Sequence, residues 1–128
     1  KHNNVEFIIL GSPDNNPGGI SSEIVDKWQD EGYIIYPGYC DVVPWIKKSS
    51  VFVLPSYREG YPRSTQEAMS IGRAVITTDV PGCNELVKNN GFILSEPDFD
   101  FSRLGIALES VIGEFSGVPL SSVSVLQE

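Results

Sequence analysis

The sequence predicts an α/β protein built around a parallel sheet. Two patterns alternate along its 128 residues, namely short apolar runs and segments with helical spacing of apolar side chains. The apolar runs are nearly continuous, as in strands that are buried on both faces. Five such alternations predict right-handed βαβ crossovers, with about five parallel strands and helices on both faces of the sheet.

The expected strands are short and rich in Val, Ile, Phe and Tyr. They cover residues 5–10, 33–36, 51–54, 74–77 and 91–94. The expected helices lie between and after them, over residues 20–32, 41–50, 64–73, 83–91 and 101–115.

Turn and cap residues define the ends of several helices. Gly32 and Gly72 provide stops for the first and third helices, because glycine readily adopts the left-handed conformation after a helix. Asp41 opens the second helix, with Pro44 tolerated only in its first turn. We expect one domain over residues 1–116 and a flexible, Ser-rich tail over residues 117–128.

The composition excludes several classes of function. The net charge of −8 argues against general binding of nucleic acid or anionic lipid. Cys40 and Cys83 lack the spacing of a zinc site or a disulfide framework, and no other metal-ligand cluster stands out. No apolar run approaches the roughly 20 residues of a membrane-spanning helix, and the N-terminus lacks the features of a signal peptide. An anionic ligand would therefore depend on helix N-termini and a few arginines.

Four loops that follow expected strands carry glycines and other turn residues. They cover residues 11–19, 37–40, 55–63 and 78–85. Simple turn chemistry explains each loop taken alone. In a parallel sheet, however, all four lie at the carboxyl edge, where ligand sites form. Their shared edge predicts a cleft.

Glu59 and Glu67 allow two interpretations. Ser64 and Glu67 have the spacing of a capping box, in which Glu67 is structural, and Glu59 is then an exposed loop charge. Alternatively, both carboxylates flank a helix N-terminus whose free N–H groups suit a phosphate. The local pattern leaves both interpretations open.

The segment VFVLPSYREGYPRSTQEAMSIGRAVITTDVPGCNELV (51–87) resembles the nucleotide-sugar-binding region of retaining GT-B glycosyltransferases. That family is marked by two glutamates separated by seven residues, here Glu59 and Glu67, with Gly60 and Pro62 after the first. The flanking strands and loops agree with the family from VEFIILG (5–11) to about residue 112. The resemblance implies a Rossmann-like domain that is the C-terminal, donor-binding half of a GT-B enzyme and lacks its first strand.

The resemblance also implies roles for individual residues. Glu67 would accept hydrogen bonds from the ribose hydroxyls of the donor, and Glu59, the catalytic-site residue, would contact the transferred sugar. The other implied donor-binding residues are Gly60, Tyr61, Pro62, Arg63 and Ser64 near the sugar and diphosphate, Gly38 and Tyr39 near the base, and Gly11 and Ser12 at the border of the pocket.

The implied reaction is transfer of a sugar from a nucleotide diphosphate-sugar to a glycan or lipid-linked acceptor, with retention and without a metal or other cofactor. The acceptor would bind an N-terminal domain that this chain lacks, so we expect the isolated chain to be inactive. The full-length protein would be cytoplasmic and peripheral at the inner membrane face, with any membrane contact through the missing half. The alternatives are a related nucleotide-sugar epimerase, a phosphorylase, for which no cofactor lysine is evident, or a non-catalytic nucleotide-binding module.

Overall fold

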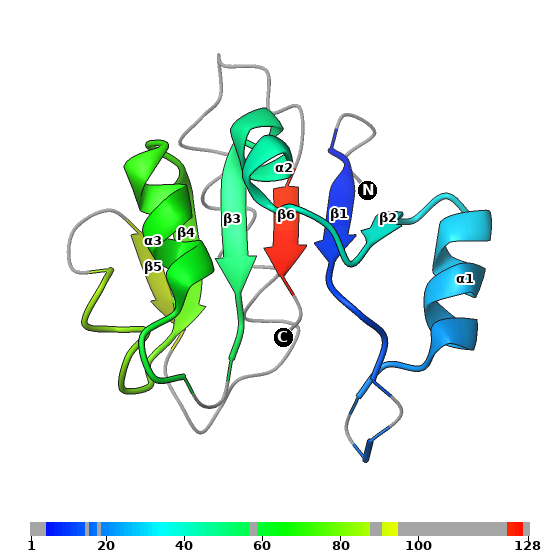
Figure 1. Cartoon of the computed structure of the whole chain (residues 1–128), viewed down its shortest axis with the longest axis horizontal. Helices are drawn as coiled ribbons and strands as arrows, with labels where there is room; N and C mark the ends of the chain where they lie inside the picture. The colour runs from blue at the N-terminus through cyan, green and yellow to red at the C-terminus, as the bar shows by residue number, and fades with distance from the viewer. Residues whose placement is uncertain are drawn as a thin grey trace.

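A computed structural model describes residues 5–14, 16–17, 19–56 and 59–87, together with the backbone of 91–94 and 123–126. It contains one sheet of six strands, all paired in parallel (Figure 1). In sheet order the strands are β2 (Ile35–Gly38), β1 (Phe7–Leu10), β6 (Val123–Leu126), β3 (Val51–Leu54), β4 (Ala74–Thr78) and β5 (Gly91–Leu94). The parallel α/β architecture predicted from the sequence is confirmed.

The helices of the described residues are α1 (Ser22–Asp30), α2 (Val43–Lys48) and α3 (Arg63–Ser70). The first and third end in the same way. Gly32 and Gly72 have φ values of 74° and 77°, and the residues after them donate to carbonyls five positions earlier. These are Schellman motifs, which glycine makes without steric cost. The expected glycine stops are confirmed.

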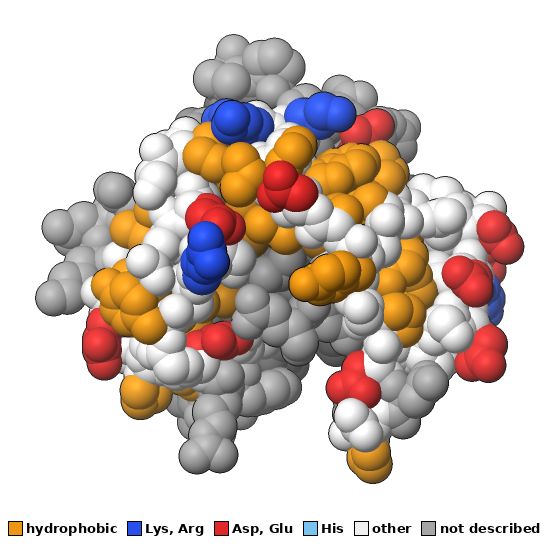
Figure 2. Space-filling model, in the orientation of Figure 1, with side chains coloured by type: hydrophobic (Ala, Val, Ile, Leu, Met, Phe, Trp, Pro, Cys, Tyr) orange, Lys and Arg blue, Asp and Glu red, His pale blue; other side chains and the backbone are white. Residues whose placement is uncertain are grey.

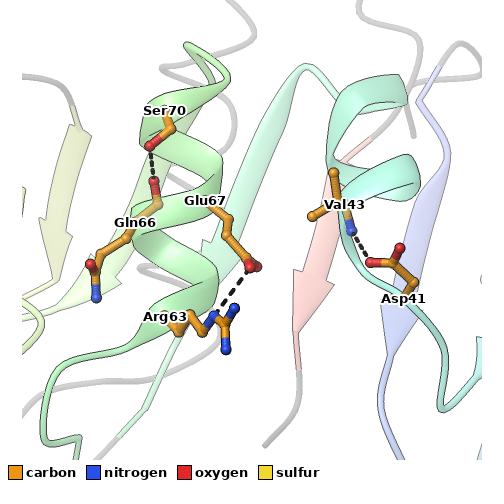
Figure 3. Close-up of polar contacts among 6 residues, drawn as sticks. All are labelled: Asp41, Val43, Arg63, Gln66, Glu67 and Ser70. Atoms are coloured by element: carbon orange, nitrogen blue, oxygen red, sulfur yellow. Dashed lines mark hydrogen bonds and ion pairs between the residues drawn. The ribbon is translucent and has the colours of Figure 1, made fainter.

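The helix expected to open at Asp41 begins at Val43, with Val42 as its N-cap and without a side-chain cap from that residue. Asp41 Oδ1 accepts a hydrogen bond of 3.1 Å from the Val43 N–H, and Pro44 lies in the first turn, where no intrahelical N–H is needed (Figure 3). Lys47 and Lys48 occupy the last turn, where positive charge is favourable.

The main core lies between the sheet and helices α2 and α3. Its apolar side chains come from three strands, from both helices and from the turn after β4. They are Ile8, Leu10, Ile46, Phe52, Leu54, Ala68, Val75 and Val87. All four residues of β3 are fully buried, including Val51 and Val53, which alternate with the core-facing Phe52 and Leu54. Both faces of β3 are therefore covered, as its continuous apolar run predicts.

Several expected elements differ from the structure in their bounds or are not formed. Strand β2 begins at Ile35 rather than at residue 33, because the Tyr33 N–H bonds to Trp28 O and completes the end of α1. The helix expected over residues 83–91 is not formed in its described part, where Cys83 and Asn84 both donate to Val80 O in a turn. The helix expected over 101–115 lies outside the described residues. We expected helices on both faces of the sheet. Helices α2 and α3 contribute to the same core cluster and therefore cover the same face.

The C-terminal segment departs furthest from expectation. We predicted a flexible tail over residues 117–128, whereas Val123–Leu126 form β6 in the middle of the sheet. This strand pairs with β1 from Phe7 to Leu10 and with β3 from Val51 to Val53. The Val-Ser-Val-Leu sequence is compatible with a strand because Val favours extended backbone. Because β6 lies between β1 and β3, its backbone pairs with a strand on each side.

We predict that proline at position 124 weakens the whole sheet. Ser124→Pro removes a ladder N–H from a strand that is paired on both sides, so the free energy of unfolding should fall by roughly 3 kcal/mol. Urea denaturation gives the stability, and amide hydrogen exchange should accelerate in β1 and β3.

A matched serine-to-proline control lies at Ser22, the first residue of α1. Proline is favoured there, so Ser22→Pro should change stability by less than about 0.5 kcal/mol. Unchanged exchange in β1 and β3 of Ser124→Pro would show that β6 is not paired with them.

Candidate functional site

The four loops singled out in the sequence follow β1, β2, β3 and β4. Because every strand is parallel, these loops leave the same edge of the sheet, at the bottom of Figure 1. The strand order reverses at β6, because β1 leads outward to β2 while β3 leads the other way to β4 and β5. Such a reversal at the carboxyl edge is where open α/β sheets bind ligands.

One half of the site joins the loops after β1 and β2. The Gly11 N–H donates to Gly38 O at 3.2 Å, and the Tyr36 hydroxyl donates to Gly11 O at 2.7 Å. Gly11 and Gly38 have φ values of 126° and 82°, which only glycine adopts readily. Ser12 is exposed, and the side chain of Tyr39 is 89% exposed beside this junction. The structure thus brings Gly11 and Gly38 together, as expected.

The other half joins the loops after β3 and β4. Glu59 is partly buried, and its Oε1 accepts a hydrogen bond of 2.8 Å from the Ser56 hydroxyl. A Cβ added to Gly82 would lie 2.2 Å from Gly60 O, so the turn after β4 rests directly on the Glu59–Gly60 backbone. Tyr61 is 61% exposed. Glu59 is therefore a supported residue and not a free loop charge.

The capping box predicted for α3 is absent. The helix begins at Arg63, with Pro62 as its N-cap, and has no side-chain cap. Ser64 lies inside the first turn, where it is 5% exposed and its hydroxyl has no partner among the described groups. Proline cannot cap with a side-chain oxygen, and the chain enters the helix one residue earlier than expected. The first-turn amides are consequently left without a side-chain acceptor.

Glu67 is paired with an arginine instead. Arg63 Nε lies 3.5 Å from Glu67 Oε1, one helical turn away (Figure 3). The Arg63 side chain is 91% exposed, so the pair contributes little to stability. In Figure 3, Glu67 extends from α3 toward α2, whereas Gln66 lies on the other side of the helix. Glu67 is thus available at the edge where the strand order reverses.

The electrostatics of the site come from main-chain groups more than from side-chain cations. In Figure 2, Lys and Arg side chains gather mainly at the top of the view, away from the carboxyl edge of the sheet, while Asp and Glu are spread over this face. Within the described part of the chain, no group of three His, Cys, Asp or Glu residues is placed to hold a metal ion. Among the described residues, neither Cys40 nor Cys83 forms a disulfide. The described helices include none that is long and apolar enough to cross a membrane.

Sequence reasoning missed the supporting residues of the site. Thr65, Thr77 and Thr78 are fully buried, and Thr77 and Thr78 hydrogen-bond to the chain leaving β3. Ser56, in the loop after β3, is a further supporting residue, because its hydroxyl donates to Glu59 and its carbonyl accepts from Thr78. The available signal was the Thr-Thr pair, which ends an otherwise apolar strand with two polar side chains.

Together these features define a parallel α/β protein with a candidate site at the reversal of its strand order, next to a helix without a side-chain cap. The sequence pattern of the family "Glycosyl transferases group 1" matches residues 1–111. The chain belongs to this family.

Curated relatives support the assignment. An N,N'-diacetylbacillosaminyl-diphospho-undecaprenol alpha-1,3-N-acetylgalactosaminyltransferase of Campylobacter jejuni is 37% identical over 84 residues, or 65% of this chain and 21% of the relative. The capsular polysaccharide biosynthesis glycosyltransferase CapM of Staphylococcus aureus is 30% identical over 98 residues, or 75% and 26%. A UDP-Gal:alpha-D-GlcNAc-diphosphoundecaprenol alpha-1,3-galactosyltransferase of Escherichia coli is 44% identical over 62 residues, or 47% and 16%. The matched segments are thus about a quarter or less of these relatives.

The absence of a capping box leads to a stability prediction. Ser64→Ala should leave the free energy of unfolding unchanged or slightly raised, because it removes a buried hydroxyl that lacks a partner. A working capping box would instead lose about 1 kcal/mol. Urea denaturation of the two proteins distinguishes these outcomes, and a loss of that size would restore the capping role.

Proposed function

We propose that this chain is the nucleotide-sugar-binding part of a GT-B glycosyltransferase that transfers a sugar with retention to a glycan or lipid-linked acceptor. The observation that carries the proposal is the uncapped N-terminus of α3, with Glu59 before it and Glu67 on its second turn. It lies beside the reversal of strand order in a chain that belongs to the group 1 glycosyltransferases.

The donor diphosphate would lie against the first turn of α3. The amides of Arg63 and Ser64 lack intrahelical acceptors, and the positive end of the helix dipole favours an anion there. The amides of Gly60 and Tyr61 precede them on the same loop, while Pro62 has no N–H to offer. Arg63 is exposed and can exchange its weak contact with Glu67 for a phosphate oxygen.

The two carboxylates would hold the hydroxyl groups of the donor. A carboxylate accepts two hydrogen bonds at once, which suits Glu67 for the vicinal hydroxyls of the ribose. Glu59 would contact the transferred sugar on the other side of the diphosphate. The base would lie toward Gly38 and Tyr39, with Gly11 and Ser12 at the border, because these loops form the other half of the same edge.

In the proposed reaction, the bond between the anomeric carbon and the diphosphate oxygen breaks, and the acceptor hydroxyl oxygen bonds to the same face of the sugar while its proton passes to the leaving diphosphate. Negative charge then grows on the leaving diphosphate. Preoriented amides at a helix N-terminus stabilise such charge without reorganising. The role we assign to the chain is therefore to bind the donor and stabilise its leaving group.

The acceptor would bind elsewhere in a full-length parent. The matched segments cover only 21% and 16% of the two relatives whose names include a diphosphoundecaprenol-linked acceptor. We propose an acceptor of this chemical type for the parent protein at the cytoplasmic face of the membrane, and donor binding without transfer for the 128-residue chain.

We predict that Glu67→Ala weakens donor binding without unfolding the chain. Loss of hydrogen bonds to a charged acceptor should raise the Kd for a UDP-sugar at least about tenfold. The free energy of unfolding should change by less than about 0.5 kcal/mol, because the Arg63 contact is exposed. Calorimetric titration and urea denaturation measure the two quantities.

Glu31→Ala is the matched control. Glu31 makes a similar exposed contact with Lys27, at 3.9 Å and one turn apart, but it lies at the end of α1. This variant should bind the donor like the unaltered chain. Equal losses in the two variants, or a Glu67→Ala variant that binds normally, would refute the assigned role of Glu67.

Retention predicts the stereochemistry of the product. A full-length protein that contains this chain should convert an α-linked nucleotide sugar into an α-linked glycoside. The coupling constant of the anomeric proton in the NMR spectrum of the product reports the configuration. A β-linked product from the same donor would contradict the proposal.

A further inference from the structure

The segment that carries Glu59 is held where the chain leaves β3. The last register pair of β3 and β4 joins Leu54 to Thr77. The Thr77 hydroxyl donates to Leu54 O at 3.0 Å, and the Thr78 hydroxyl donates to Ser56 O. Successive residues of a strand point to opposite faces, so the two hydroxyls hold this exit from both sides of the sheet. Both threonines are fully buried, which makes their hydrogen bonds costly to lose.

Ser56 links this anchor to the carboxylate. Its carbonyl accepts from Thr78, while its hydroxyl donates to Glu59 Oε1 at 2.8 Å. A hydrogen bond to an ionised acceptor is stronger than one between neutral groups. Ser56 therefore holds one of the two carboxylate oxygens of Glu59, and Oε2 receives no hydrogen bond from the described residues.

The main chain of Glu59 lies close to the turn that follows β4. Gly82, which follows β4 and is buried, has a φ of 87°. A Cβ at this position would lie 2.6 Å from Glu59 O and 2.2 Å from Gly60 O. Only glycine allows the turn to approach the backbone this closely. Both the side chain and the main chain of Glu59 are thus positioned by residues at the end of β4 or in the turn after it.

We propose that Ser56 is a positioning residue for the transferred sugar: anchored by Thr78, its hydroxyl orients the Glu59 carboxylate toward the donor. The inference rests on the proposed function of Glu59. It assigns sugar selectivity to a relay from Thr78 through Ser56 to Glu59, separate from the contacts of α3 with the nucleotide. Removing the relay should weaken recognition of the sugar and leave recognition of the nucleoside diphosphate intact.

Calorimetry on the 128-residue chain tests this separation. The probes are UDP-galactose, UDP-N-acetylgalactosamine and GDP-mannose, each compared with its own nucleoside diphosphate. For the preferred donor, Ser56→Ala should lower the affinity ratio of donor to diphosphate about five- to tenfold, as expected for one hydrogen bond. Affinity for the diphosphate alone should stay within about twofold, since α3 is unaltered.

Conservative variants separate positioning from general loss of structure. Thr78→Val should also lower the affinity ratio of donor to diphosphate. Ser56→Thr and Thr78→Ser keep a hydroxyl, so their ratios should stay close to that of the unaltered chain. Ser70→Ala is the matched control, because Ser70 donates to Gln66 O on the exposed side of α3 at 2.8 Å. It should leave the ratio unchanged. Equal weakening of donor and diphosphate by Ser56→Ala would overturn the proposal.

A measurement without donor tests the relay itself. Three-bond NMR couplings report the χ1 rotamer of Glu59, which should be single in the unaltered chain and in Ser70→Ala, and averaged in Ser56→Ala. An unchanged rotamer in Ser56→Ala would overturn the positioning role. Failure of the proposed function has a different signature: no donor would bind better than its diphosphate, yet Ser56→Ala would still release the Glu59 side chain.

Discussion

Parallel pairing around β3 is the constraint on which the rest of the structure depends. The strand has hydrogen-bonded neighbours on both sides and four fully buried side chains, so it cannot shift without exposing the core. Its last residue is therefore a fixed point, from which the chain runs through Ser56 and Glu59 into α3. The same parallel arrangement places the ends of β1 and β2 at this edge, so the loops after these strands and after β3 leave the sheet on one side.

The proposed binding of an anionic donor to this acidic chain requires an attraction that does not depend on net charge. With a formal charge of −8, long-range steering of a nucleotide diphosphate would be unfavourable. Oriented amides act only at short range, and an uncapped helix offers several of them together. The absence of a side-chain cap on α3 thus has a functional interpretation. The first-turn N–H groups of α3, which a capping box would pair, are left for the proposed donor.

Particular residues show why some features were predictable and others were not. Continuous apolar runs such as Val51–Leu54 predict strands buried on both faces, because they are short and rich in β-branched and aromatic residues. Gly32 and Gly72 predict helix ends through their own backbone freedom. The predicted capping box is absent because α3 begins at Arg63, one residue before Ser64, with Pro62 as its N-cap. The sequence did not reveal β6 in the expected tail, because its pairing depends on two strands more than 60 residues away in sequence.

The sequence by itself determined the parallel α/β class, the carboxyl-edge loops, and the Glu59 and Glu67 pair with its family resemblance. These follow from apolar periodicity, turn residues and motif spacing, which are all local. Only the tertiary structure decided that β6 completes the sheet, that Ser64 does not cap α3, and that Thr78 and Ser56 support Glu59. Those features depend on contacts between distant segments, and a hydroxyl in a strand does not reveal which carbonyl it will meet until the strands are paired.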